Sequence, residues 1–305
     1  MEENQVSRTA LLTTYYRAYH AMHNVPQIFD DFLASHFLAE EEHASFEQEK
    51  LMLLQSLVPT LATSFPDQAT ALAWVMQAAS PSSLILGRSR YAEDSLEKAV
   101  MQGVKQYVIL GAGMDTFAFR QPEMIKQLQV FEVDHPATQA FKRGRLAELG
   151  WVHPAQLHFV PLDFTQGNLE DALTCSSYDI HTPSFFSWLG VTYYLPLDAV
   201  FTTLRTIANI APAGSMLIFD YYDTDIFVPE KAARWVQLGT EQVSRWGEPL
   251  KMGFDTSTLA ADLAHLSLSL REDLSPSDIQ ERYFKGRNDH YRALEHAHFA
   301  CAVVE

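Results

Sequence analysis

The order of apolar and polar residues divides the chain into two parts. Over residues 1–104, apolar side chains recur three and four positions apart, as in "SRTALLTTYYRAYHAM" and "FEQEKLMLLQSLV". That spacing predicts amphipathic helices. Four prolines separate the helical stretches: Pro26, Pro59, Pro66 and Pro81. The pattern therefore predicts an all-helical N-terminal segment over 1–104.

Over residues 105–305, short apolar runs alternate with helical stretches. The runs include "QYVIL", "LQVFEVD", "LHFVPLD" and "SMLIFDYY". Between two of them lies "PATQAFKRGRLAELG", a predicted helix with Pro136 near its start and Gly150 at its end. Such alternation is typical of βαβ units and a mainly parallel sheet. We find no repeat or long linker, so we expect the helical segment to pack on this α/β core.

Composition narrows the kinds of partner and compartment. Acidic residues outnumber basic ones 38 to 22, a formal charge of −16, which disfavours a general affinity for nucleic acid or an anionic membrane. The two cysteines, Cys175 and Cys301, lie outside any CxxC spacing, so neither a disulfide framework nor a zinc site is indicated. No apolar stretch approaches the roughly 18 residues of a membrane span. We expect a cytoplasmic protein without a membrane partner; the oligomeric state stays open.

The turn after the first predicted strand indicates a ligand. In "YVILGAGMDTFAFR", Gly111 and Gly113 allow a tight turn and a close approach of a ligand to the backbone. In an open parallel sheet, ligands bind beyond the carboxyl ends of the strands. Asp134 ends the next strand, 23 residues after Gly111, near the roughly 20-residue spacing at which an acid reaches a ribose hydroxyl. The pattern predicts an adenosine-containing ligand.

Two adenosine ligands fit this pattern to different degrees. A dinucleotide fingerprint requires a third glycine, but Thr116 occupies that position. Asp115, just past the glycines, suits a ligand without phosphate that carries a positive sulfonium and ammonium. The sequence thus favours S-adenosylmethionine. An NAD(P)-dependent oxidoreductase is one alternative, and a non-catalytic protein that binds S-adenosylmethionine is another.

Several motifs also carry a family resemblance. In order, "GRSRYAEDSLEKA", "QYVILGAGMDTFAFR", "VFEVDHP", "VPLDF" and "SWLGVTYYLPL" resemble the motifs of the leucine carboxyl methyltransferase family, which includes bacterial S-adenosylmethionine-dependent O-methyltransferases. The resemblance runs from about Ser7 to the end of the chain. It implies a class I methyltransferase fold: a Rossmann-like seven-stranded sheet whose last strand, here "HFACAVV", is antiparallel, with an added helical N-terminal lid.

The resemblance assigns roles to the first half of the cofactor site. Arg90 matches the arginine that pairs with the methionine carboxylate of the cofactor, and Arg88 is a second candidate for that contact. A guanidinium suits a carboxylate because it can bind both oxygens. Gly111 and Gly113 form the floor under the methionine portion, and Asp134 matches the ribose ligand.

The remaining roles concern the adenine and the reaction. Asp163 and Phe164 match the pair that meets the adenine, while Leu189 stands where some family members carry a glutamate that contacts the cofactor. Tyr194 matches a family tyrosine and is the predicted catalytic residue, with Tyr221 behind it.

The predicted reaction is methyl transfer to a carboxylate or hydroxyl of a small molecule or peptide. A carboxylate acceptor needs no base, whereas a hydroxyl would benefit from one. We expect the helical segment, with Tyr15, Tyr16, Arg17 and Tyr19, to form the lid and the acceptor wall. No metal is predicted, because the late histidines lack a ligand spacing with carboxylates; these are His290, His296 and His298.

Overall fold

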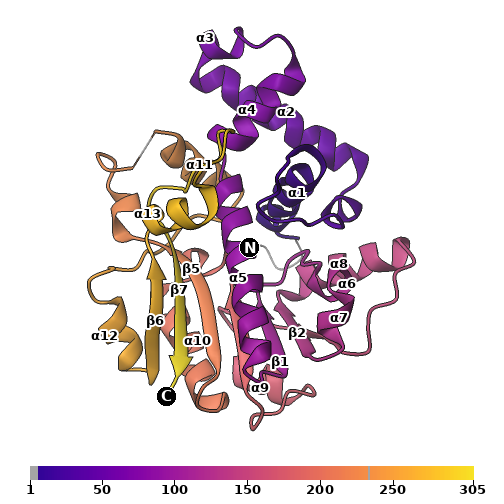
Figure 1. Ribbon diagram of the computed structural model, residues 1–305, viewed down its shortest axis with the longest axis vertical. Helices are drawn as coiled ribbons and strands as arrows, with labels where there is room; N and C mark the ends of the chain where they lie inside the picture. Colours follow the sequence, from indigo (N-terminus) through magenta and orange to yellow (C-terminus); the bar gives the residue numbers. More distant parts are fainter. Residues whose placement is uncertain (1–5, 233) are drawn as a thin grey trace.

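The computed structural model describes residues 6–232 and 234–305 (Figure 1). Its first part is helical, as the spacing predicts. Ser7 caps the first helix by accepting a hydrogen bond of 3.1 Å from the Ala10 N–H, which satisfies one of the donors that a helix start leaves free. The elements are α1 (Arg8–His23), η1 (Ala34–Phe37), α2 (Glu40–Leu57), α3 (Pro59–Ala62), α4 (Gln68–Ala78) and α5 (Ser82–Met101).

The second part is built on a seven-stranded sheet with the strand order β3-β2-β1-β4-β5-β7-β6. Its first five strands pair in parallel, and β7 runs antiparallel to both β5 and β6. The predicted fold class, including the antiparallel last strand, is therefore confirmed. The strands are β1 (Gln106–Leu110), β2 (Gln129–Asp134), β3 (Leu157–Pro161), β4 (Ser184–Trp188), β5 (Met216–Tyr222), β6 (Leu268–Leu274) and β7 (Ala297–Val304).

Helices cover both faces of the sheet (Figure 1). In β1, Tyr107 and Ile109 belong to one hydrophobic cluster, whereas Val108 and Leu110 belong to another on the opposite face. This is why the β1 sequence is continuously apolar. The other elements of this part are α6 (Phe117–Arg120), α7 (Pro122–Ile125), α8 (Pro136–Glu148), α9 (Leu169–Thr174), η2 (Thr192–Tyr194), α10 (Leu197–Ile210), η3 (Thr224–Phe227), α11 (Arg234–Arg245), α12 (Leu259–Ala264), α13 (Pro276–Ile279) and η4 (Gln280–Phe284).

The helical segment contacts the sheet in two ways. The long α5 packs directly on β4, β5 and β7, and a Cβ built on Gly87 would be 3.4 Å from the Phe299 ring. In contrast, α1 lies near the turn that follows β1, where Arg17 Nη2 donates a hydrogen bond of 2.8 Å to the Met114 carbonyl. The domain boundary between residues 104 and 105 stays a prediction.

Helix length and hydropathy bear on membrane insertion within the residues that the structure describes. No single helix there is both long and apolar enough to cross a bilayer. Only α4 and α5 taken together, across a bend of 57°, meet the length and composition required. The cytoplasmic location stays a prediction.

Candidate functional site

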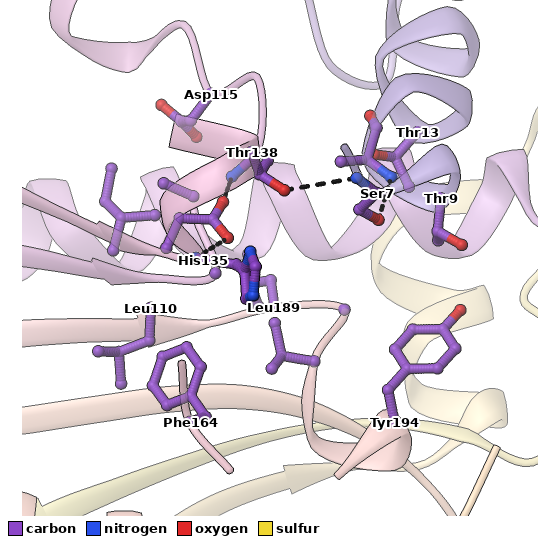
Figure 2. A pocket seen from close by; sticks show the side chains of 18 of the residues that line it. Ser7, Thr9, Thr13, Leu110, Asp115, His135, Thr138, Phe164, Leu189 and Tyr194 are labelled. Carbon is purple, nitrogen blue, oxygen red and sulfur yellow. Dashed lines mark hydrogen bonds between the residues drawn. The ribbon is translucent and has the colours of Figure 1, made fainter. Parts of the chain in front are cut away.

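A cavity of about 320 Å³ lies at the carboxyl ends of the parallel strands. Residues that end or follow four strands line it: Gly111 after β1, Asp134 in β2, Asp163 after β3 and Leu189 after β4. In Figure 2, Phe164 and Leu189 lie on one side of this cavity, and Ser7 and Thr13 of the α1 region face them. Its position and size suit a small-molecule ligand.

The glycine turn needs its glycines for steric reasons. Gly111 has a φ of +75°, and a Cβ at this position would lie 2.2 Å from Val191 Cγ2. Gly113 has a φ of +53°, and its N–H donates to Asp134 Oδ2. The turn also bonds back to β2, because the Gly111 N–H donates to the Val133 carbonyl at 2.8 Å. The backbone of the turn thus forms one wall of the cavity.

Asp134 joins the turn to the second strand. Its Oδ2 accepts from Gly113 N–H, and its Oδ1 accepts from the His135 N–H at 2.6 Å. Burial raises the pKa of Asp134, and these two backbone donors partly counter that rise. A carboxylate has about four lone-pair sites, so Asp134 retains capacity for hydroxyl donors of a ligand in the cavity it lines.

Asp163 and Phe164 form another wall. Asp163 Oδ1 accepts from Thr165 N–H at 2.8 Å and from Thr165 Oγ1 at 2.7 Å. Burial opposes the charge of Asp163, but these bonds lower its pKa overall. Phe164 lies on Trp188, with ring centroids 6.0 Å apart, and Leu189 adds a further apolar side chain to the cavity. A flat aromatic ring of a ligand would contact the apolar side chains of Phe164 and Leu189 and the carboxylate of Asp163 here.

The structure separates the two candidate arginines. Arg90 does not line the cavity: its side chain is 51% exposed and pairs with Asp94 at 2.7 Å on the surface of α5. Arg88 does line it, and only 7% of the residue is exposed. Two positions on a helix differ by about 200° in direction, so only one of the pair can face the sheet. Arg90, the arginine predicted for the cofactor carboxylate, therefore lies away from the cavity, and Arg88 is the arginine of this pair that lines it.

Arg88 is held by a buried acid that the sequence analysis missed. Its Nη1 donates to Asp220 Oδ2 and to the Tyr193 hydroxyl, each at 2.8 Å. Asp220, 1% exposed and within β5, also accepts from the Gly190 N–H at 2.6 Å. Arg88 Nη2 lies so close to Gly190 that a Cβ there would be 2.4 Å away. The sequence signal for it is an acid within an otherwise apolar and aromatic strand run, "IFDYY".

A second buried ion pair contacts the segment that follows the glycine turn. Lys142 of α8 donates through Nζ to Glu132 Oε2 at 2.5 Å and to the Asp115 carbonyl at 2.6 Å. Burial raises the pKa of Glu132, against the opposite effect of Lys142. The pair ties the turn to β2 and α8, and sequence reasoning did not find it.

The two candidate tyrosines lie in different places. Tyr194 lines the cavity (Figure 2), and burial raises its pKa, with Glu248 as the next cause. Its phenol is therefore protonated at neutral pH and can donate a hydrogen bond. Tyr221 is not part of the cavity lining: its hydroxyl donates to Asp273 at 2.9 Å, and its ring stacks on His298.

The predicted lid residues also divide. Arg17 lines the cavity, whereas Tyr15, Tyr16 and Tyr19 pack in a hydrophobic cluster with residues of α2 and α4. The late His296 approaches Asp223 at 3.0 Å. Within residues 6–232 and 234–305, no group of three or more His, Cys, Asp and Glu side chains could hold a metal ion.

A second cavity of about 120 Å³ borders the first. Residues common to both linings mark the boundary, among them Thr9, Arg88, Gly190 and Tyr194. The two spaces therefore adjoin each other beside Tyr194.

The first cavity fits S-adenosylmethionine. Its polar groups are strand-end carboxylates and the peptide groups of a glycine turn, which suit ribose hydroxyls and a positive sulfonium. Two buried arginines line it, Arg17 and Arg88, and a guanidinium is suited to a carboxylate. A pyrophosphate would lack the N-terminus of a long helix, because the helix after the turn, α6, has only four residues.

Comparisons with known proteins agree with this fit. The family model described as "Leucine carboxyl methyltransferase" matches residues 10–208. A Bacillus subtilis protein named "Putative S-adenosyl-L-methionine-dependent methyltransferase YktD" is 37% identical over 305 residues, 99% of both chains. A Frankia alni protein of the same description is 30% identical over 73% of this chain and 77% of its own. A Streptomyces avermitilis protein of the duf574 family has the same fold, with a TM-score of 0.58, 11% identity and 99% coverage of both chains.

Proposed function

Because the chain belongs to the leucine carboxyl methyltransferase family and is an S-adenosylmethionine-dependent methyltransferase, we propose that it methylates an oxygen of a small molecule or peptide. The observation that carries this proposal is the pair of adjoining cavities, which meet at Tyr194. The first suits the methyl donor, and the second provides room for an acceptor beside it.

We assign the cofactor contacts residue by residue. Asp134 binds the ribose hydroxyls, Asp163 and Phe164 bind the adenine, and the turn at Gly111 and Gly113 lies against the methionine portion. Arg88, in place of Arg90, binds the carboxylate of the cofactor. Leu189 supplies an apolar contact where some relatives have a glutamate. These assignments rest on which side chains line the first cavity.

The main task of the protein in methyl transfer is to position the donor and the acceptor. When bound, S-adenosylmethionine supplies a methyl group that already carries its leaving group. The protein has to hold the acceptor oxygen in line and exclude water. Tyr194 is suited to orient the acceptor as a hydrogen-bond donor, since burial raises its pKa and keeps the phenol protonated. A protonated phenol is no base, so the site favours a carboxylate acceptor over a hydroxyl.

Calorimetry and a turnover assay test the proposal. We expect S-adenosylhomocysteine to bind at one site per chain, and NADH to show no change in fluorescence on titration. With S-adenosylmethionine, turnover that forms S-adenosylhomocysteine is expected with carboxylic acids and not with the matching primary alcohols. Turnover only with alcohols would overturn the choice of carboxylate. Binding without turnover across the panel would instead favour a non-catalytic binding protein.

A further inference from the structure

The second cavity is enclosed by helices and has mainly apolar walls. Aliphatic and aromatic side chains from α1, α2, α5, η2 and α11 contribute to it. Its volume is about 120 Å³, and a cavity of about 150 Å³ holds benzene. It is smaller than that cavity, and so has room for a short alkyl chain. The apolar lining includes Leu12, Leu53, Leu57, Leu84, Tyr222, Ile226, Val236, Val243, Trp246, Leu250 and Leu294.

One charged side chain in this lining stands out. Lys50, in the middle of α2, is only 2% exposed and lines the second cavity but not the first. Among the described residues, its Nζ makes no hydrogen bond and no ion pair with a carboxylate. It lies 5.3 Å from the centroid of the Tyr16 ring.

The neighbours of Lys50 do not supply an anion. Glu49, the next residue along the helix, pairs with Arg8 at 3.2 Å and accepts from Gln242. Tyr16, which also lines the cavity, has a buried hydroxyl without a hydrogen-bond partner. An ammonium buried without a counter-charge is costly. Within residues 6–232 and 234–305, this cavity thus contains a lysine without an ion-pair partner and a buried tyrosine hydroxyl without a hydrogen-bond partner.

We propose that the second cavity binds an acceptor with an apolar body and a carboxylate, and that Lys50 binds this carboxylate. The inference rests on the proposed function for the position of the methyl donor. Because Lys50 is not part of the first cavity, its carboxylate is distinct from the oxygen that takes the methyl near Tyr194. The acceptor then has two polar ends, and its methylated product keeps one charge.

Burial is consistent with a charged Lys50 at neutral pH. Burial lowers the pKa of the ammonium to about 8. Glu49 raises this pKa and Arg8 lowers it, each by less than burial does. At pH 7 most molecules would therefore carry the positive charge. A bound carboxylate would restore the pKa toward its usual range and offset the cost of burial.

Small acids and their neutral analogues test the proposal by calorimetry. The probes are benzoate, phenylacetate and hexanoate with the corresponding carboxamides, titrated into protein saturated with S-adenosylhomocysteine at pH 7. We expect at least one acid to bind ten or more times more tightly than its amide. Lys50→Met should weaken binding of that acid at least tenfold and leave the amide within twofold. Lys126→Met removes the same charge from an exposed lysine and should change neither.

Two results would overturn the inference. One is wild-type protein that binds no acid better than its amide. The other is Lys50→Met protein that retains the preference for the acid. A failure of S-adenosylhomocysteine to bind would count against the proposed function instead. In that case the same acid and amide titrations without it still decide whether Lys50 is an anion site.

Discussion

The two adjoining cavities are built in different ways. Backbone makes most of the specific features of the first: strand ends, a glycine turn and the peptide donors that hold Asp134. Side chains of packed helices make the second, where the specific feature is a single lysine of α2. A backbone site is fixed by local sequence and fold, whereas a helical wall can change side chain by side chain. The same donor pocket can thus serve different acceptors.

Replacing Gly111 with Ala should damage the first cavity most. The new Cβ would lie 2.2 Å from Val191 at a φ of +75°, so strain and a clash combine. We expect a loss of about 3 kcal/mol in the free energy of unfolding, and loss of measurable S-adenosylhomocysteine binding. Gly150→Ala is the matched control, because its φ is +67° with no atom within 4 Å. It should lose about 1 kcal/mol. Equal losses of unfolding free energy for the two variants in urea denaturation would show that the turn has room for a Cβ at Gly111.

Lys50→Met should stabilise the ligand-free protein. The folded pKa of about 8 lies below the usual 10.5, so the folded state disfavours the charged lysine, and the wild type is penalised fully below pH 8. At 1.36 kcal/mol per pKa unit, the variant should gain about 3 kcal/mol at pH 7. The gain should shrink as the pH rises from 8 to 10.5, where the lysine becomes neutral. Urea denaturation of both proteins at pH 7 and at pH 10.5 checks this. A variant that is less stable than the wild type at pH 7 would contradict it.

Asp134→Ala should weaken S-adenosylhomocysteine binding by about 1.5–3 kcal/mol, the range for hydrogen bonds to a charged group. Asp163→Ala should have a smaller effect, about 1 kcal/mol, because the Asp163 side chain is 30% exposed and competes with water. Calorimetry measures both. Binding of the acid probe to the second cavity should stay within twofold. An unchanged dissociation constant for the Asp134 variant would remove it as the ribose ligand.

The smallest expected effects on cofactor binding concern the two arginines of α5. Arg88→Lys keeps the charge but loses the planar fork, so S-adenosylhomocysteine binding should weaken by about 1.5 kcal/mol. Arg90→Lys changes an exposed ion pair and should alter binding by less than about 0.5 kcal/mol. Equal effects of the two substitutions in the same titration would mean that neither guanidinium reaches the cofactor.

Local features of the first cavity could be predicted from the sequence. Gly111 and Asp134 follow apolar runs that predict strands, and the ends of parallel strands meet at one edge of the sheet. The chain order of the motifs therefore translates directly into neighbours in space. The same reasoning predicts the sheet itself, because the strand runs are short and clearly separated.

Long-range pairs could not be predicted in this way. Arg88 and Asp220 are 132 residues apart and meet only because α5 packs on β5. The motif "RSRY" contains two arginines, and only the direction of the helix face separates them. Lys50 is one of several charged residues in α2, and nothing in its neighbours along the chain distinguishes it. Its burial depends on the packing of α2 against Tyr16 of α1.

Finally, α1 is a wall of both cavities. Thr9 and Thr13 line each of them, and the Ser7 N–H donates to Thr138 at 3.4 Å while the Thr9 N–H donates to Glu248 at 3.2 Å. A ligand in either space that fixes α1 changes the wall that the other ligand meets. Thermodynamic linkage makes such an influence reciprocal: whatever factor the methyl donor applies to acceptor affinity, the acceptor applies to donor affinity. Any cooperativity that α1 transmits between the two substrates is therefore equal in both directions.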